Sequence, residues 1–431
     1  MDLELSLAGG MLEAAEAASP VDAVAAVTRE LGLSLDATEV SFLIADLSGR
    51  ALVRLTHVPL GHPDANGRGE PAGDEERRDS EDYATVVPFD GGPAEQAVRT
   101  QEVQVAPPAD PIGGWGVFAP VTERGEVIGL LELTLPREPG TETLTEARRL
   151  AHLLGFVVIA NRRHTDLFEW GQRTRPLSLS AEIQQRLLPG PRTCEAGAFT
   201  LAGWLEPAAD IAGDTFDYSL GRDALHLSMT DAMGHGVAAA LTATLCVGGL
   251  RGARRQGASP VEQATATNTA LAQHASGSGL DDFVTGLVGR LDLRSARLEL
   301  VNAGHVAPYL LRDAEVSRLE LPADVPFGMF ADTAYRSTEF ELVPGDRLVI
   351  VTDGMLERNA AGIDLPGAIR DTRSLHPREA VRALADSALE ATGHALSDDA
   401  TVLCIDWLGE HGGSRSSVAG ADQQRASRPL R

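Results

Sequence analysis

The chain has 431 residues, more than one typical domain needs, so two or three domains are expected. Its formal net charge of −25 at pH 7 argues against a nucleic-acid partner, because a phosphate backbone requires a basic binding face. The apolar share of 43% is ordinary for a globular protein that buries real cores.

Three widely spaced cysteines, Cys194, Cys246 and Cys404, show neither a zinc-binding spacing nor a disulfide framework. Cys246 and Cys404 stand in apolar runs and are expected to be small buried hydrophobic residues. No secretion signal is visible at the N-terminus, and the apolar runs 150–160 and 237–250 are shorter than a bilayer span. We therefore expect a cytoplasmic protein without a membrane partner.

The first 165 residues carry the pattern of a small α/β domain of the size of a sensor module. A helix beginning at Ser19-Pro20 precedes two hairpins. The strands of these hairpins are Val40–Asp46 with Ala51–Thr56, and Val117–Val121 with Val127–Leu135. Between the hairpins, residues 61–82 are rich in Gly, Pro and charged residues, which predicts a long loop.

A helical linker is expected to connect this sensor-sized domain, residues 1–165, to the rest of the chain. Thr143-Leu-Thr-Glu146 is a capping box, and the helix that it opens is predicted to run toward Arg175, where Pro176 interrupts it. A second amphipathic piece, Leu179–Leu188, ends at a Pro-Gly pair. The linker is thus placed at residues 166–190.

Residues 191–408 are dominated by short strands joined by tight turns, which favours antiparallel pairing and an α+β domain with helices outside the sheets. Three helices are predicted among these strands, at Val237–Arg255, Pro260–His274 and Pro377–Ala391. The last segment, residues 409–431, has no periodicity and is predicted to be a disordered tail.

Five segments of this second domain each place acidic residues or glycines at the edge of an apolar run. They are Ile211-Ala-Gly-Asp-Thr-Phe-Asp217, Thr230-Asp-Ala-Met-Gly-His-Gly236, Val301-Asn-Ala-Gly-His305, Val351-Thr-Asp-Gly354 and Ser397-Asp-Asp-Ala-Thr401. In an antiparallel sheet the end of one strand lies beside the start of its neighbour. Acidic residues spread over nearly two hundred positions can therefore gather at one edge.

A gathering of carboxylates favours a hard divalent cation. Like charges in one site raise each other's pKa, and bound Mg²⁺ or Mn²⁺ removes that conflict. Oxygen ligands without cysteine or clustered histidine favour these ions over zinc. Two such ions, about 3.5–4 Å apart, would bridge a water, lower its pKa and orient it toward a phosphoryl group. The neighbouring Gly213 and Gly354 would allow a close approach of backbone and metal.

Taken singly, each acidic residue is more simply a turn former or a helix cap, and Asp292 and Asp346 are interpreted in that way. Asp217 is expected to point away from the site and to serve structure. His235 and His305 are interpreted first as residues that fix loops by hydrogen bonds. His235 is also the candidate for a base, or for the acid that serves the leaving group.

From about Leu179 to Trp407 the sequence resembles the SpoIIE-type branch of the PPM metal-dependent serine/threonine protein phosphatases. The resemblance rests on nine separated elements that occur in the expected order. Five lie within the segments quoted above, and the other four are Ile183-Gln-Gln-Arg-Leu-Leu-Pro189, Phe283-Val-Thr285, Pro326-Phe-Gly328 and Pro344-Gly-Asp346. No single element would carry the resemblance alone.

The resemblance implies a β-sandwich flanked by helices, with two Mn²⁺ or Mg²⁺ ions at one end. Carried over residue by residue, the carboxylate ligands would be Asp214, Asp231, Asp353 and Asp398, with Asp399 as the alternative for the last pair. Ala232 stands where the family contributes a backbone carbonyl. Ala212 and Thr215-Phe216 depart mildly from the family pattern and remove no ligand, so an active enzyme is expected.

The N-terminal part resembles a GAF domain, by its element order and by the strand Gly129-Leu-Leu-Glu132. No cysteine in residues 1–165 is available to anchor a bilin. The helical region 143–188 is a candidate regulatory element, and its apolar residues suit either an ordinary core face or the seam of a homodimer.

The implied activity is hydrolysis of phosphoserine or phosphothreonine by metal-activated water, on a phosphorylated anti-sigma-factor antagonist of the STAS type. One alternative is a protein that binds a phosphoprotein without hydrolysis, which would favour Asn or Ala at the ligand positions. A second alternative is a hydrolase of nucleotides or small phosphoesters. It would require a base-stacking pocket, whereas aromatic residues make up only 4% of the chain.

Overall fold

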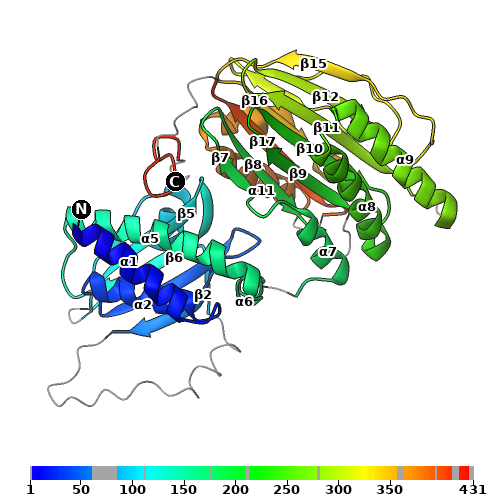
Figure 1. Ribbon diagram of the computed structural model, residues 1–431. Coiled ribbons are helices and arrows are strands. Elements are labelled where there is room, and N and C mark those ends of the chain that lie inside the picture. Colours follow the sequence, from blue (N-terminus) through cyan, green and yellow to red (C-terminus); the bar gives the residue numbers. More distant parts are fainter. Residues whose placement is uncertain are drawn as a thin grey trace. The chain divides into compact units, whose positions relative to one another are not determined.

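The computed structural model describes residues 2–60, 85–110, 113–174, 176–208, 213–278, 282–356, 364–393, 396–409 and 417–426. The chain divides into two compact units (Figure 1). Unit 1 comprises Met1–Pro176 and Ser417–Arg431, and unit 2 comprises Leu177–Ser416. The long loop predicted at residues 61–82 lies outside the described residues.

Unit 1 is built on an antiparallel sheet of six described strands in the order β3-β2-β1-β6-β5-β4. The strands are β1 (Glu39–Ala45), β2 (Ala51–Pro59), β3 (Val86–Pro88), β4 (Gln104–Ala106), β5 (Trp115–Glu123) and β6 (Glu126–Leu135). The helices are α1 (Asp2–Ala17), α2 (Ala23–Ser34), α4 (Pro93–Thr100), α5 (Thr141–Asn161) and α6 (Leu167–Gly171), with a 3-10 turn η1 (Arg162–His164). Helix α1 had no counterpart among the predicted elements.

Both predicted hairpins of unit 1 are present, as the pairs β1/β2 and β5/β6. The second hairpin turns at Arg124 and Gly125, whose φ angles of 47° and 77° are both in the left-handed region. A two-residue turn with positive φ at both positions matches the right-handed twist of the flanking strands.

The helix predicted from the capping box begins and ends elsewhere. Helix α5 starts at Thr141, after Gly140 as N-cap with no side-chain cap, so the capping box does not form. The helix ends at Asn161, and the 3-10 turn and α6 replace the predicted continuation toward Arg175. Its buried residues pack into the core of unit 1, so tertiary burial rather than the cap decides where the helix lies.

The C-terminal tail differs from the expected disordered segment at residues 409–431. Its described part, residues 417–426, belongs to unit 1. The Gly125 N–H donates to the Gly420 carbonyl at 2.9 Å, and the Gln423 side chain contacts Arg148 at 3.1 Å and the Gln101 carbonyl at 3.2 Å. Both ends of the chain therefore contribute to unit 1.

Unit 2 contains two antiparallel sheets. The first has the order β15-β12-β11-β10-β9 and the second has the order β14-β13-β16-β17-β8-β7. The strands of the first sheet are β9 (Asp214–Leu220), β10 (Ala224–Ala232), β11 (Val284–Asp292), β12 (Arg297–Ala303) and β15 (Ser337–Glu341). Those of the second sheet are β7 (Thr193–Glu195), β8 (Phe199–Glu206), β13 (Tyr309–Arg312), β14 (Glu315–Arg318), β16 (Arg347–Val351) and β17 (Ala400–Trp407).

The helices of unit 2 lie on the outer faces of these sheets (Figure 1). They are α7 (Leu179–Leu187), α8 (Gly236–Arg255), α9 (Pro260–Ser278), α10 (Leu365–Asp371) and α11 (Pro377–Ala391), with 3-10 turns η2 (Asp353–Met355) and η3 (Thr372–Ser374). Residues of α8 and α9 pack on the first sheet, and residues of α10 and α11 pack on the second. The inner faces of the two sheets form a third core between them. The result is the predicted β-sandwich flanked by helices.

Helix α8 is, by length and composition, long and apolar enough to cross a membrane, although the run Val237–Leu250 had been judged too short. Core helices of globular domains satisfy the same criteria, and α8 buries a face that includes Ala243, Cys246 and Leu250 against the first sheet. Its apolar character is therefore explained in part by packing.

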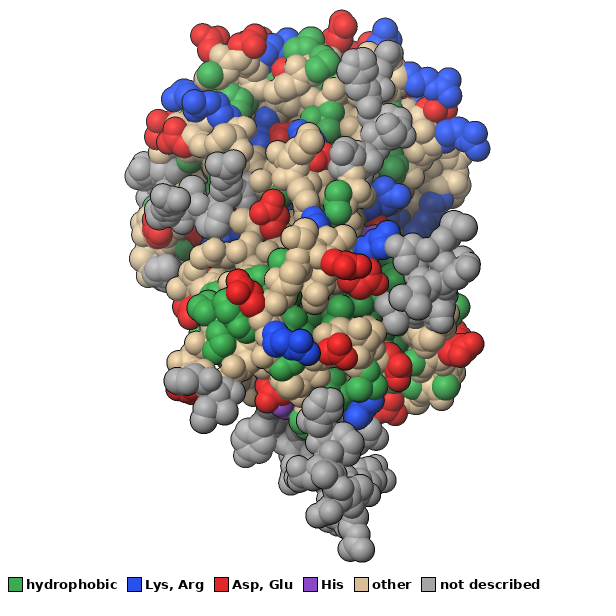
Figure 2. All heavy atoms as spheres, turned by 90° about the vertical axis from the view of Figure 1, so that its left-hand side faces the viewer, with side chains coloured by type: hydrophobic (Ala, Val, Ile, Leu, Met, Phe, Trp, Pro, Cys, Tyr) green, Lys and Arg blue, Asp and Glu red, His purple; other side chains and the backbone are tan. Residues whose placement is uncertain are grey.

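Acidic and basic side chains are interspersed on the face of the molecule drawn in Figure 2, among hydrophobic side chains. On this face the acidic residues are therefore mixed with basic ones, although acidic residues are in excess in the sequence. Cys246 and Cys404 are fully buried, as predicted for small hydrophobic residues, and Cys194 is buried as well.

Candidate metal centre

Asp214 and Asp231 meet at one end of the first sheet of unit 2. Side chains alternate between the two faces of a strand, so Asp214 shares the inner face with Phe216, and Asp231 shares it with Met229. Asp214 and Asp231 are directly paired residues of neighbouring strands. Asp214 is the first residue of β9, and Asp231 is the last but one of β10.

Two threonines of the second sheet hold the buried carboxylate of Asp214. Thr352 and Thr401 follow the same alternation, on the inner side of β16 and β17. Each hydroxyl donates a hydrogen bond of 2.6 Å to Asp214 Oδ2. These bonds join the two sheets at the end of the sandwich where Asp214 and Asp231 lie, which is called the acidic end below.

Asp353, Asp398 and Asp399 extend the cluster from the second sheet. Asp353 follows β16 and is exposed, Asp398 is half-buried, and Asp399 is 1% exposed. Both oxygens of Asp399 are occupied: Oδ1 accepts from the Ala208 N–H at 2.8 Å and Oδ2 from Gln184 Nε2 at 2.6 Å. Asp398 is thus the more accessible member of the pair.

Burial and mutual repulsion raise the pKa of three of these carboxyl groups. Burial raises the pKa of Asp231 to about 7, with contributions from Asp353, Asp398 and Asp399. Burial and then Asp231 and Asp399 raise the pKa of Asp214 well above its ordinary value. Burial raises the pKa of Asp399 to about 6, although its hydrogen bonds oppose the shift. These couplings bring the predicted acidic residues into one electrostatic cluster.

The chemistry of this cluster fits a divalent cation, but its present geometry does not form a closed ligand set. Within the described ranges, no group of three or more His, Cys, Asp or Glu side chains is arranged to hold a metal ion. Oxygen donors that raise one another's pKa are the groups that a hard cation stabilises.

Two glycines allow the backbone to pack tightly around the acidic residues. A Cβ on Gly213 would lie 2.5 Å from the Ala232 carbonyl oxygen, and a Cβ on Gly354 would lie 2.0 Å from the Asp399 carbonyl oxygen. Neither distance is sterically possible, so any side chain here would displace backbone at the acidic end. The sequence had indicated these glycines for a close approach of backbone and metal, whereas the structure shows a close approach of backbone to backbone.

Ala232 and His235 lie in the segment that follows Asp231. Ala232 is buried at the end of β10, and its N–H donates to the Gly213 carbonyl at 3.2 Å. His235 is exposed, and it is the N-cap residue of α8 with no side-chain capping bond. It lies four residues beyond Asp231, in the segment that leads out of the acidic end.

The remaining acidic candidates have structural partners. Asp217 forms ion pairs of 2.8 Å with Arg251 and with Arg254, so it points away from the cluster as expected. Asp346 is paired with Arg312 at 2.6 Å. Asp292 accepts from backbone N–H groups of the turn at residues 294–295, as a turn former does.

His305 is buried and fixes a loop. Asn302 holds its backbone through two hydrogen bonds, of 2.7 and 3.0 Å. Its Nδ1 lies 3.2 Å from the hydroxyl of Thr285, which is the strand partner of Asp231. Burial lowers the pKa of His305 to about 4, so the neutral imidazole is favoured.

The sequence did not reveal the parts played by Gln184, Thr352 and Thr401. The two threonines stand beside recognised acidic residues, and the alternation of strand residues could have placed them on the inner face. Gln184 lies in a recognised motif, but its long-range contacts could not be read from a helical pattern.

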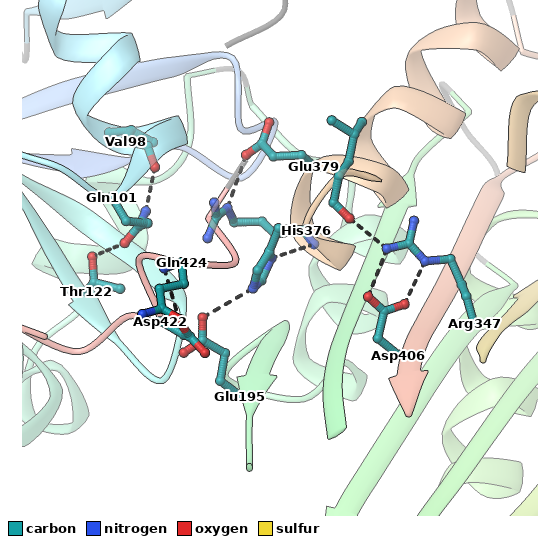
Figure 3. Close-up of polar contacts among 12 residues, drawn as sticks. Val98, Gln101, Thr122, Glu195, Arg347, His376, Glu379, Asp406, Asp422 and Gln424 are labelled. Atoms are coloured by element: carbon teal, nitrogen blue, oxygen red, sulfur yellow. Dashed lines mark hydrogen bonds and ion pairs between the residues drawn. The ribbon is translucent and has the colours of Figure 1, made fainter. Parts of the chain in front are cut away.

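A second polar cluster lies at the other end of β16 and β17 (Figure 3). The buried Arg347 forms a bidentate ion pair with Asp406, at 2.6 and 2.9 Å, and also donates to the carbonyls of Thr372 and Leu375. Nearby, His376 Nε2 lies 3.2 Å from Glu195. Arg347 begins β16 and Asp353 follows its end, so this cluster is separate from the acidic end. Its bonds to Thr372 and Leu375 hold the segment before α11 to the sheet.

Residues 221–408 match the family model of stage II sporulation protein E, SpoIIE. The chain is 23% identical over 235 residues to phosphoserine phosphatase RsbU of Bacillus subtilis, covering 53% of this chain and 69% of that protein. It is 24% identical over 243 residues to phosphoserine phosphatase RsbP of the same organism, covering 54% of this chain and 58% of RsbP. Among solved structures, the SiaA-PP2C domain of Pseudomonas aeruginosa has 24% identity and a TM-score of 0.44, covering 53% of this chain and 94% of that one.

The match to the family model lies entirely within the second unit. Asp231, Asp353, Asp398 and Asp399 lie within the matched range, whereas Asp214 and α7 precede it. Residues 221–408 of the second unit are therefore similar to the SpoIIE family and to the phosphoserine phosphatases RsbU and RsbP.

Proposed function

We propose that this protein is a metal-dependent phosphatase that hydrolyses phosphoserine or phosphothreonine on a regulatory protein. One observation carries the proposal: five acidic residues from four separate segments converge at one end of the β-sandwich and perturb one another electrostatically. The names of the relatives RsbU and RsbP, both phosphoserine phosphatases, support the same reaction class.

In this proposal two Mn²⁺ or Mg²⁺ ions are held by Asp214, Asp231, Asp353, Asp398 and the carbonyl of Ala232. When bound, the cations supply Lewis acidity and activate the attacking water. Thr352 and Thr401 orient Asp214 by fixing Oδ2, which leaves its other oxygen for a ligand. In this proposal the exposed His235 gives a proton to the leaving alkoxide.

The substrate class follows from chemistry at the edge of the site. We propose a phosphorylated protein, and in particular an anti-sigma-factor antagonist of the STAS type. An exposed apolar stripe on α8 begins beside the acidic end: Met233, Val237, Leu241 and Leu245 are 41–54% exposed. Residues 237, 241 and 245 recur every four positions and so share one helix face. A protein whose phosphoserine reaches Asp231 would pass over this stripe.

The N-terminal unit is proposed to be a GAF-like sensor that regulates the phosphatase in the cytoplasm. Homodimerisation through the helical region 143–188 is part of this proposal. Leu150, Leu154 and Val158 of α5 are buried in the core, whereas Leu153, Phe156 and Ile159 are 36–50% exposed. The exposed set supports a seam with a second copy of this chain. Leu153→Glu with Phe156→Glu should convert a dimer to a monomer in light scattering, and an unchanged mass would remove the seam.

Two other activities remain to be separated from this one by experiment. A non-catalytic phosphoprotein binder would release no phosphate, and a small-phosphoester hydrolase would prefer a nucleotide to a phosphopeptide. The decisive assay compares a phosphoserine peptide, a phosphorylated STAS-domain protein and ATP, each with Mn²⁺ and with a chelator. We expect Mn²⁺-dependent release from the phosphoprotein and phosphopeptide, with the nucleotide the poorest substrate.

A further inference from the structure

Helix α7 reaches the acidic end of the sandwich through one side chain, that of Gln184. The helix buries the face formed by Ser180, Ala181, Gln184 and Leu187. Gln184 is 1% exposed, and it is the residue on this face with a long polar side chain. Its neighbour Gln185 is only half-buried and accepts a hydrogen bond from Arg192 instead.

The amide nitrogen of Gln184 serves two acceptors at once. Gln184 Nε2 donates to the Asp214 carbonyl at 2.9 Å and to Asp399 Oδ2 at 2.6 Å. An amide NH₂ has two hydrogens, so both are used. Because a carbonyl oxygen cannot donate, the nitrogen rather than the oxygen must face Asp214, and this fixes the orientation of the amide.

These two acceptors belong to different sheets. Asp214 begins β9 of the first sheet, and Asp399 immediately precedes β17 of the second. The Gln184 amide therefore bridges the two sheets where the acidic residues converge. Asp399 in turn donates its N–H to Asp398 Oδ1 at 2.8 Å, so the bridge continues to the more accessible carboxylate.

The other end of the Gln184 amide has no partner. Its Oε1 is buried and makes no hydrogen bond within the described part of the chain. A buried acceptor without a partner is unfavourable, and such groups in native structures call for a reason. An apolar side chain of the same length would avoid the cost of burying Oε1 without a partner. The two hydrogen bonds donated by Nε2 are therefore the reason for a glutamine at this position.

The C-terminal end of α7 is fixed separately, by α8. Arg251 donates to the Leu187 carbonyl at 2.6 Å and is itself held by Asp217 of β9 at 2.8 Å. The helix is thus attached to the sheet at both of these points, and a shift of α7 would move Gln184 relative to Asp399 and Asp214.

We propose that Gln184 is the positioning residue through which helix α7 holds the acidic end in the arrangement that accepts divalent cations. This inference rests on the proposed function, because it assumes that Mn²⁺ or Mg²⁺ binds among these carboxylates. It means that the Gln184 side chain, on the helix that precedes the two sheets, helps to set the affinity for the cation. Gln184 does not contact substrate in this proposal; it acts through Asp399 and Asp214.

The test measures Mn²⁺ binding to the full chain without turnover. Gln184→Met keeps the length of the side chain and removes both N–H groups, and Gln184→Glu keeps its shape and replaces the donor by an acceptor. Gln185→Met is the matched control on the same helix. Each chelator-treated protein is titrated with Mn²⁺ by isothermal calorimetry, well below its unfolding temperature, after its circular dichroism has been compared with wild type.

We expect the Mn²⁺ dissociation constant to rise about 10–100-fold in both Gln184 variants, as for other residues that orient metal ligands, and to stay unchanged in Gln185→Met. Excess Mn²⁺ should restore phosphate release by Gln184→Met. A purely structural role would lower the melting temperature and leave Mn²⁺ affinity as in wild type, and that result would overturn the inference. The Glu variant keeps the test available if the Met variant does not fold.

Failure of this inference is distinguishable from failure of the proposed function. Wild type that binds Mn²⁺ but releases no phosphate would refute the phosphatase activity and leave the role of Gln184 standing. Active wild type with a Gln184→Met variant of unchanged Mn²⁺ affinity would refute only the role of Gln184.

Discussion

Asp214 and Asp231 are cross-strand partners on the inner face of one sheet. Like charges placed directly opposite one another destabilise a pair of strands. Burial adds to this repulsion, and the pKa of each carboxyl group is raised. The fold therefore places two repelling carboxylates side by side, and a cation bound between them would remove the repulsion.

The first prediction concerns stability without metal. Burial and neighbouring carboxylates raise the pKa of Asp231 to about 7, far above that of an unfolded Asp, about 3.9. A raised pKa in the folded state means that stability is fully present below about pH 4 and is lost as the pH rises through 7. Asp231→Asn should therefore melt at a higher temperature than wild type at pH 8 in chelator.

The advantage of Asp231→Asn should shrink as the pH falls from 8 to 5. In a domain of this size, 1 kcal/mol corresponds to a shift of about 2–4 °C, which calorimetry resolves. Saturating Mn²⁺ should reverse the order, because the cation stabilises the wild-type cluster. A variant less stable than wild type at pH 8 without metal would show that Asp231 is not under repulsion.

The second prediction concerns the hydroxyl groups that hold Asp214. Thr401→Val removes one of the two 2.6 Å hydrogen bonds to Asp214 Oδ2 while keeping the shape of the side chain. Loss of a hydrogen bond to a charged group costs about 1.5–3 kcal/mol. We expect lower unfolding free energy and weaker Mn²⁺ activation of phosphate release. Thr338→Val, on the edge strand β15, is the control and should change neither quantity.

The third prediction concerns the apolar stripe of α8. Leu241 is 54% exposed, and a glutamate there should lower kcat/KM for a phosphoprotein substrate by about tenfold or more. Hydrolysis of a small aryl phosphate should be unaffected, because that substrate does not reach the stripe. Leu220→Glu is the matched control, since Leu220 is 46% exposed at the end of β9 away from Asp214. Equal losses of kcat/KM on both substrates would instead show that Leu241 maintains the structure of the site.

The fourth prediction concerns the attachment of α8 to the first sheet. Asp217 is paired with Arg251 and Arg254 and is largely buried. Asp217→Asn should lower the free energy of unfolding by about 1.5–3 kcal/mol, because two hydrogen-bonded cations lose their counter-charge. Denaturant unfolding measures this change. Asp223→Asn, in an exposed pair with Arg294, should cost less than about 1 kcal/mol.

Much of unit 2 could be predicted from sequence because its signals are local. The alternation of strand residues and the turn residues predicted antiparallel strands, and the helix beginning near Val237 was predicted to end at Arg255, as observed. Convergence of the acidic segments was also predicted, because strand ends meet at one edge of an antiparallel sheet. The helix α5 was mispredicted at both ends, since a favourable capping sequence did not outweigh burial in the core of unit 1.

The finer features of the site depend on contacts between distant segments. Gln184 and Asp399 are 215 positions apart, and Thr401 and Asp214 are 187 apart. Nothing in a helical or alternating pattern specifies such a pair. For the same reason the packing of residues 417–426 on unit 1 was not anticipated: a segment poor in apolar residues resembles a disordered tail until its partners are known.

The most direct measurement is release of inorganic phosphate from a phosphoserine protein by the purified full chain, with Mn²⁺ and with chelator, for wild type and Asp231→Asn. We predict Mn²⁺-dependent release by wild type and its loss in a variant that is folded and more stable without metal. Undiminished release by Asp231→Asn, or release by wild type that persists in chelator, would contradict a phosphatase centred on this acidic cluster.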